Sequence, residues 1–197
     1  MSTKIGIIGG SGLDDPTLFD IARDTSVETP YGEPSSSLRE GYIAGVPVVL
    51  LARHGRDHTI PPTQVNYRAN IWALKHAGCT HVLASTAVGS LREEIKRGDL
   101  ILPDQFIDFT RSRALSFFES FEPGHPVHTA MADPFDAGLR KVMAEELKAL
   151  GYRFHDGGTV VTIEGPRFST RAESRMFRLW GGGHHQYEHH HGGDHGQ

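Results

Sequence analysis

Apolar residues along the chain follow two patterns, short continuous runs and longer segments in which they recur every three or four positions. The short runs are bounded by glycine, proline or polar residues and predict buried strands. The segments predicted as strands are 4–8, 37–43, 46–53, 80–90, 100–109 and 159–163. Of these, 37–43 is more polar than the others, and 80–90 runs out into a small-residue loop at Thr86-Ala87. The second and third runs flank Ala44-Gly45, so together they predict a hairpin whose second strand ends at Arg53.

The longer segments have the spacing of amphipathic helices. One covers 63–78 and another begins at Asp133-Pro134 and ends before Gly151. The apolar stripe of the second helix is formed by Leu139, Val142, Met143, Leu147 and Leu150. A stripe of this kind predicts a helix that packs one face against the rest of the protein.

Two pairs of residues have the spacing of a capping box, in which a side chain at each end of the first turn bonds the other's backbone. Thr170 and Glu173 predict the start of a helix over 171–180. Ser90 and Glu93 predict a brief helical turn.

The order of these elements predicts the fold class. Strands and helices alternate over residues 1–180, which predicts a single α/β domain with a mixed, twisted central sheet flanked by helices. Residues 111–132 are loop-like. Residues 181–197 lack apolar periodicity and hold six of the chain's 13 histidines among many glycines, so we expect a disordered tail.

Composition narrows the classes of function. The 197 residues carry a net charge of −4, which argues against nucleic acid as the main partner. The apolar runs are too short to cross a membrane, and glycine interrupts the first of them before a signal-peptide core could form. The chain has one cysteine, so it forms no internal disulfide. These features favour a soluble protein of the cytoplasm.

Two glycine-containing turns follow predicted strands and carry the candidate chemistry. Gly9-Gly10-Ser11-Gly12 lacks the order of a dinucleotide-binding loop, but its amides and the Ser11 hydroxyl could bind an anion. The second turn follows the hairpin and reads Arg53-His54-Gly55. Here His54 could carry a phosphoryl group, as in histidine phosphatases, or Arg53 could grip free phosphate, or the triplet could be a surface turn. These residues alone leave all three open.

Motifs spread over nearly the whole chain occur in an order typical of one family. They are KIGIIGGSGLDDP, VETPYGEPS, LLARHGRDHTIPP, VNYRANIWALK, GCTHV, GSLREEI, GDLILPDQFIDFT and VTIEGPRFSTRAES. From residue 4 to about residue 181 the chain thus resembles the purine nucleoside phosphorylase family, and most closely its branch that acts on 5′-methylthioadenosine. The resemblance implies phosphorolysis of that nucleoside to adenine and 5-methylthioribose 1-phosphate, in purine and methionine salvage. It also implies a homotrimer that uses inorganic phosphate as co-substrate and no metal or other cofactor.

The resemblance also assigns roles to individual residues. The phosphate-binding set would be Ser11, Arg53, His54, Thr86 and the amide of Ala87. Phe168 would stack on the purine or ribose, and Ser169 would lie near the edge of the base. His128 would reach the 5′-substituent pocket of a neighbouring subunit.

After the helix that follows Thr170, the sequence departs from the family. The family continues with a Met-Thr step and an acidic residue at the purine, and residues 181–197 offer no counterpart to them. We therefore expect a C-terminally truncated fold with impaired turnover and no identified catalytic acid. The alternatives are a 6-oxopurine nucleoside phosphorylase, a histidine phosphatase using His54, and an inactive fragment or metal-binding module acting through the tail.

Overall fold

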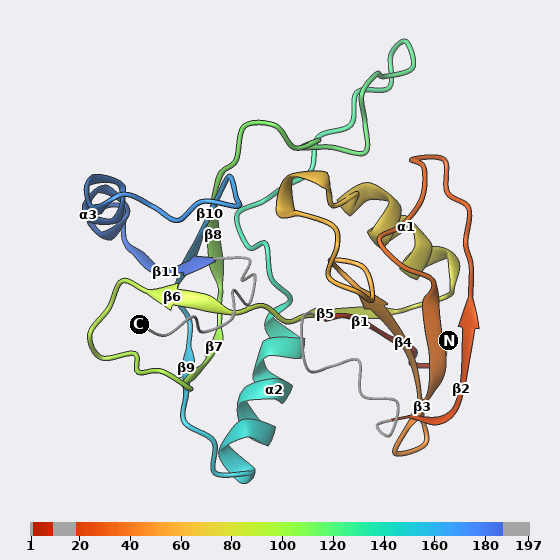
Figure 1. Cartoon of the computed structure of the whole chain (residues 1–197), viewed down its shortest axis with the longest axis horizontal. Helices are drawn as coiled ribbons and strands as arrows, with labels where there is room; N and C mark the ends of the chain where they lie inside the picture. Colours follow the sequence, from red (N-terminus) through yellow and green to blue (C-terminus); the bar gives the residue numbers. More distant parts are fainter. Residues whose placement is uncertain (1, 10–18, 187–197) are drawn as a thin grey trace, which may run out of the picture. The chain divides into compact units, whose positions relative to one another are not determined.

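The computed structural model describes residues 2–9 and 19–186 (Figure 1). Among these, residues 2–9, 19–87 and 113–117 form one compact unit, and residues 88–112 and 118–186 form another. The sequence pattern did not indicate this division. The predicted turn at Ser11 and the residues after 186 lie outside the described part of the chain.

The first unit is built on a mixed sheet with the strand order β2-β3-β4-β1-β5 (Figure 1). Its strands are β1 (Ile5–Gly9), β2 (Asp20–Thr25), β3 (Leu38–Ile43), β4 (Val46–Ala52) and β5 (His81–Ala84). The predicted hairpin is confirmed, because β3 and β4 pair antiparallel on either side of Ala44-Gly45. Strand β1 lies between β4 and β5 and pairs with both in parallel.

Helix α1 (Tyr67–His76) makes the crossover from β4 to β5, after a short 3-10 turn, η2 (Pro62–Gln64). The Asn66 side chain caps its first turn by accepting the backbone N–H of Ala69. The apolar face of the helix is buried against the sheet in a cluster made of Ile8, Leu38, Val49, Leu51, Ala73 and Leu74. The predicted helix over 63–78 is thus confirmed in its central part, and it packs against strands β1, β3 and β4.

The second unit contains two small sheets. In one, the order is β6-β11-β10-β8, and in the other β7 pairs with β9 in parallel (Figure 1). The strands are β6 (Val88–Ser90), β7 (Leu100–Leu102), β8 (Gln105–Phe109), β9 (Phe154–Asp156), β10 (Thr159–Ile163) and β11 (Gly182–Gln186). The predicted strand 100–109 is therefore broken in two at Pro103, which has no N–H to donate. Beside this break the Asp104 carboxylate accepts the backbone N–H of Gly158 at 2.8 Å.

Helix α3 (Arg171–Leu179) begins as predicted. Thr170 and Glu173 form a capping box in which each side chain accepts the other's backbone N–H. Phe177 is fully buried on this helix, where its ring meets those of Phe109 and Trp180 edge to face. This aromatic cluster anchors the C-terminal part of α3 to β8.

Other expectations need correction. The sequence pattern predicts disorder over 181–197, but Gly182–Gln186 form β11, which pairs with β10 and β6. Strand pairing uses backbone groups, so the lack of apolar periodicity did not exclude it. At the other predicted box, Ser90 starts no helix, because its hydroxyl closes a tight turn with the backbone of Arg92.

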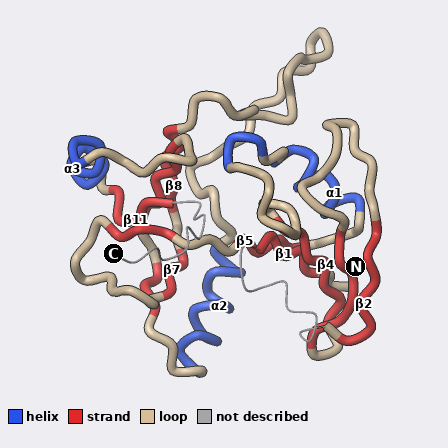
Figure 2. Tube along the Cα trace, viewed as in Figure 1, coloured by secondary structure: helices blue, strands red, loops and turns tan. Residues whose placement is uncertain are grey.

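Helix α2 (Ala137–Ala149) also differs from its prediction. It begins after Asp136, whose side chain caps it, rather than at Asp133. It lies against β9 and β7, but its apolar stripe is only partly covered, since Val142 is 54% and Leu150 69% exposed. The segment between β8 and α2 is loop, as predicted for 111–132, apart from an isolated bridge (Figure 2). None of the described helices is long and apolar enough to cross a bilayer.

Candidate oxyanion-binding site

Three neighbouring parallel strands of the first unit end at the same edge of their sheet. The register aligns Gly9 of β1 with Ala52 of β4, and Ile8 of β1 with Ala84 of β5. The chain continues this alignment past the strands, because the N–H of Arg53 donates to Gly9 and that of Ser85 donates to Ile8. Residues that follow these strands therefore lie side by side, in the place where open α/β sheets bind ligands.

The Arg53 side chain is buried at this edge, with 6% of the residue exposed. Its Nη1 donates to the carbonyl oxygen of Ser85 at 3.0 Å, which links the end of β4 to the end of β5. Its Nε donates to Nε2 of His54 at 3.3 Å. A guanidinium held in one orientation is suited to bind an oxyanion, because its planar N–H donors match the spacing of phosphate oxygens.

The His54 ring is also buried, and its bonds favour one tautomer. Nδ1 lies 2.9 Å from the carbonyl oxygen of Ile60, which can only accept, so Nδ1 carries the proton. In the neutral ring Nε2 is then an acceptor, as its bond from Arg53 requires. Both ring nitrogens thus serve to orient the arginine and the turn. This arrangement disfavours His54 as a phosphoryl carrier, because such a histidine needs a nitrogen lone pair aimed at the substrate.

The turn that carries these residues is tight. Gly55 has φ +77°, a conformation that favours glycine, and its N–H closes back on the carbonyl of Ala52. His58 also has a positive φ of 52°, and its ring stacks near that of His54 with centroids 6.3 Å apart. The N–H of Ile60 donates to the His54 carbonyl, which completes the loop.

Two of the remaining predicted phosphate residues follow β5. Thr86 is half-buried and its hydroxyl lies 3.4 Å from the carbonyl oxygen of Ala87, which is itself exposed. Because Arg53 bonds Ser85, the structure brings the Arg-His pair to the residue that precedes this Thr-Ala step. Ser11, the fifth predicted member, lies outside the described residues.

The predicted nucleoside-contacting residues all belong to the second unit. Phe168 is 56% exposed, and the hydroxyl of Ser169 is 2.8 Å from that of Ser174 on α3. His128 is exposed in the long loop, where its ring meets that of Phe121 edge to face. Arg53 belongs to the first unit, so the structure does not bring these three residues together with it.

The loop that carries Phe168 is held by an ion pair with α3. Both Nη atoms of Arg167 donate to the Glu173 carboxylate, at 2.8 and 2.7 Å, and Nη1 also donates to the Phe168 carbonyl. These bonds, together with the Thr170 backbone N–H, lower the pKa of Glu173 from 4.5 to about 2. The backbone of this loop is therefore fixed although the aromatic side chain is exposed.

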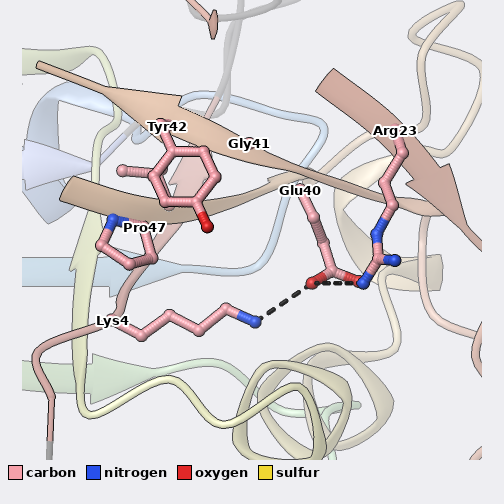
Figure 3. A pocket seen from close by; sticks show the side chains of 7 residues that line it. Lys4, Arg23, Glu40, Gly41, Tyr42 and Pro47 are labelled. Carbon is pink, nitrogen blue, oxygen red and sulfur yellow. Dashed lines mark hydrogen bonds and ion pairs between the residues drawn. The ribbon is translucent and has the colours of Figure 1, made fainter. Parts of the chain in front are cut away.

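A cavity of about 360 Å³ lies toward the amino ends of the parallel strands (Figure 3). Its lining includes Lys4, Arg23, Glu40 and Tyr42. Lys4 Nζ donates to Glu40 at 3.0 Å and to the Ala77 carbonyl at 2.7 Å, and Arg23 lies 3.6 Å from the same carboxylate. The Glu40 carboxylate is thus paired with both cations, so we interpret the cluster as a structural link between β3 and Lys4, the residue that precedes β1.

The sequence did not single out several groups that complete the site. The carbonyls of Ser85 and Ile60 are backbone acceptors, and because every residue has a backbone carbonyl, the sequence does not single them out. Arg56, two residues after His54, makes a two-pronged ion pair with Asp24 of β2. The only sequence signal for this residue is the second arginine of the motif RHGR. Among the described residues, no three His, Cys, Asp or Glu side chains gather closely enough to hold a metal ion.

The geometry defines an α/β protein with a candidate oxyanion site at its strand ends. Residues 4–183 match the phosphorylase superfamily, and the chain belongs to that family. It is similar to the S-methyl-5′-thioadenosine phosphorylase of Danio rerio, with 57% identity over 180 residues, covering 90% of this chain and 64% of that protein. The enzyme of the same name from Drosophila melanogaster is 55% identical over 184 residues, covering 92% and 64%.

Solved structures give the same result. The methylthioadenosine phosphorylase from Schistosoma mansoni in complex with adenine has a TM-score of 0.87 and 41% identity, covering 95% of this chain and 74% of that one. Its form without ligand also has a TM-score of 0.87, with 41% identity and coverage of 95% and 73%. The chain spans about 64% of the length of the two named sequence relatives, Danio and Drosophila.

Proposed function

We propose that this chain is a 5′-methylthioadenosine phosphorylase, which cleaves the nucleoside with inorganic phosphate to give adenine and 5-methylthioribose 1-phosphate. The observation that carries the proposal is the bond from Arg53 to Ser85, which fixes a buried guanidinium where three parallel strands end. The similarity to enzymes of that name supports the choice of nucleoside.

The reaction explains why donors suffice at this site. A phosphate oxygen forms a bond to C1′ of the ribose while the C1′–N9 bond breaks, and the electron pair of that bond leaves with the purine. The proton that neutralises the departing adenine comes overall from monohydrogen phosphate, which becomes the dianionic sugar phosphate. The transition state resembles that of glycoside cleavage, with positive charge on the sugar. Phosphate is itself the nucleophile, so the protein must hold it in line and stabilise charge rather than supply a covalent side chain.

Arg53 would then hold phosphate, with His54 fixing the guanidinium from the other side and the Thr86-Ala87 step supplying a hydroxyl and an amide. Phe168 would cover one face of the purine, which suits an exposed aromatic on a fixed loop. Inorganic phosphate is the co-substrate in this scheme, and the reaction calls for no metal or organic cofactor.

The proposal includes assembly as a homotrimer in the cytoplasm, with His128 reaching a neighbouring subunit. Large apolar side chains are exposed along the long loop of the second unit, which is what a subunit contact requires. They are Phe118, Phe121, Val127 and Met131, each between 41% and 53% exposed. Light scattering of the purified chain tests this part, and a monomer at high concentration would contradict it.

Product analysis tests the activity. The full chain is incubated with 5′-methylthioadenosine, with and without inorganic phosphate, and free adenine is measured. We expect adenine release only with phosphate, together with 5-methylthioribose 1-phosphate. Inosine is the comparison substrate, and faster release of hypoxanthine than of adenine would favour a 6-oxopurine enzyme. No cleavage of either nucleoside would refute the proposal.

A further inference from the structure

We propose that Asp24 and Arg56 form a positioning pair that holds the turn carrying Arg53 and His54 in its oxyanion-binding geometry. The inference rests on the proposed function of that turn, because the pair acts on phosphate only through it. It assigns a role in binding to two half-exposed residues, one on strand β2 and the other in the turn that follows β4.

The pair has two-pronged geometry. Arg56 Nη1 donates to Asp24 Oδ2 at 2.9 Å, and Nη2 donates to Oδ1 at 2.6 Å and to the hydroxyl of Ser37 at 2.9 Å. The Asp24 and Arg56 side chains are 42% and 44% exposed, and an ordinary pair at such exposure contributes little. Two parallel bonds with a third partner fix direction as well as distance, which a single exposed contact does not.

The pair connects the turn to β2, an edge strand of the sheet. Asp24 lies on β2, which is separated from β4 by β3, whereas Arg56 lies in the turn after β4. The fork therefore ties the turn to the edge strand. Only His54 and Gly55 lie between Arg53 and Arg56, and backbone bonds close this turn. A shift of the Arg56 guanidinium therefore also moves Arg53 and His54.

A second contact fixes the same turn through the segment before β3. The Ser36 hydroxyl accepts the N–H of Ala52 at 3.0 Å, and Ser35 bonds the fully buried Asn70 of α1 through both its N–H and its hydroxyl. Ser37, which receives the Arg56 bond, belongs to this anchored segment. The turn is thus held from β2 and from α1 together.

The charges at the pair keep it formed under working conditions. Asp24 faces two guanidinium groups, since Arg39 Nε lies 3.8 Å from Oδ1. The Arg56 hydrogen bonds, with the charges of Arg56 and Arg39, hold the pKa of Asp24 below its usual value. The same bonds raise the pKa of Arg56, with a smaller contribution from the charge of Asp57. Both partners are therefore charged near neutral pH.

The sign of one substitution separates positioning from direct attraction of phosphate. Asp24→Asn removes a negative charge and leaves the Arg56 charge in place. If Arg56 attracted phosphate directly, this variant would bind phosphate more tightly, because a competing carboxylate is gone. If the pair positions the turn, the same variant binds phosphate more weakly.

The experiment is calorimetric titration of the full chain with inorganic phosphate. We expect Asp24→Asn and Arg56→Gln each to weaken binding by about three- to tenfold, and the double variant to be no weaker than Arg56→Gln, as for residues of one network. The matched control is Glu40→Gln, which makes the same charge change in the same sheet, where the carboxylate pairs with Lys4 (Figure 3). That control should stay within about twofold of the wild type, as expected for a site outside the network.

Unchanged or tighter binding by Asp24→Asn would overturn the inference. A wild-type chain that binds no phosphate would instead contradict the proposed function, so the two failures are distinct. Thermal unfolding shows whether each variant is folded. If Asp24→Asn is not, Ser37→Ala decides, because it removes one bond to Arg56 and leaves both charges. We expect about twofold weaker phosphate binding by Ser37→Ala, and no change would count against the pair.

Discussion

The two candidate binding regions differ in how much of their geometry exists before a ligand binds. Arg53 and His54 are 6% and 7% exposed and are bonded to each other and to backbone carbonyls. Phe168 is 56% exposed, although the backbone around it is fixed by Arg167 and Glu173. A buried charge needs partners within the protein, whereas an aromatic face can stay exposed until a base covers it. Preorganisation is therefore concentrated where the charge lies.

The largest effect is expected from the aromatic cluster that anchors α3, the helix that follows the loop carrying Phe168. Phe177 is fully buried and its ring contacts those of Phe109 and Trp180. Phe177→Ala should lower the free energy of unfolding of the second unit by about 3–5 kcal/mol, through lost burial and a cavity. Urea denaturation followed by tryptophan fluorescence measures this in a Trp72→Phe background, in which Trp180 reports on the second unit. Phe168→Ala is the control, and an equal loss in both variants would show that the loop has no buried anchor.

The next largest effect is expected at the preorganised region. Arg53→Ala should weaken phosphate binding by about 1.5–3 kcal/mol, roughly ten- to a hundredfold, because a charge-assisted donor is removed. Calorimetry with inorganic phosphate measures it. Lys4→Ala removes a positive charge from the same unit and should bind phosphate nearly as the wild type does. Equal losses in the two variants would indicate general electrostatic attraction in place of a built site.

A smaller effect is expected from the exposed aromatic. Phe168→Ala should weaken adenine binding by about 0.5–1.5 kcal/mol, the contribution of a stacked ring, and leave phosphate affinity unchanged. Phe118, which is 50% exposed in the same unit, supplies the matched control. Fluorescence titration with adenine distinguishes them. If Phe118→Ala weakens adenine binding as much as Phe168→Ala, the assignment of the loop is wrong.

The smallest effect concerns acid stability of the loop anchor. The folded-state pKa of Glu173 is about 2, below its ordinary value of 4.5, so its ion pair stabilises the fold above pH 4.5 and loses that contribution as the pH falls toward 2. Glu173→Gln should therefore flatten the loss of thermal stability over this interval. Glu145→Gln on α2 is the control, and an identical pH profile for wild type and Glu173→Gln would contradict the assignment.

Much of this arrangement was predictable from local pattern. The hairpin, the parallel strands at 5–9 and 159–163, and the Thr170–Glu173 box all have short-range signals, and the structure confirms them. The placement of Arg53 directly after a buried strand was also visible in the sequence. What these features share is that a few adjacent residues determine them.

The errors arise where distant backbone groups decide. Strand β11 forms from a glycine- and histidine-rich segment because β10 and β6 offer it backbone partners. Strand β2 has no apolar alternation and pairs at the edge of its sheet with β3. At the site, the carbonyls of Ser85 and Ile60 orient Arg53 and His54, and backbone carbonyls have no signature in a sequence.

Mapping inorganic phosphate onto the backbone amides of the whole chain tests the central claim most directly. In a titration followed by ¹H–¹⁵N NMR, we predict saturable shifts at residues 53–55 and 85–87, the two segments that leave neighbouring strand ends. Shifts concentrated at Lys4 and Arg23 instead, or no saturable shifts at all, would contradict an oxyanion site at the carboxyl ends of β1, β4 and β5.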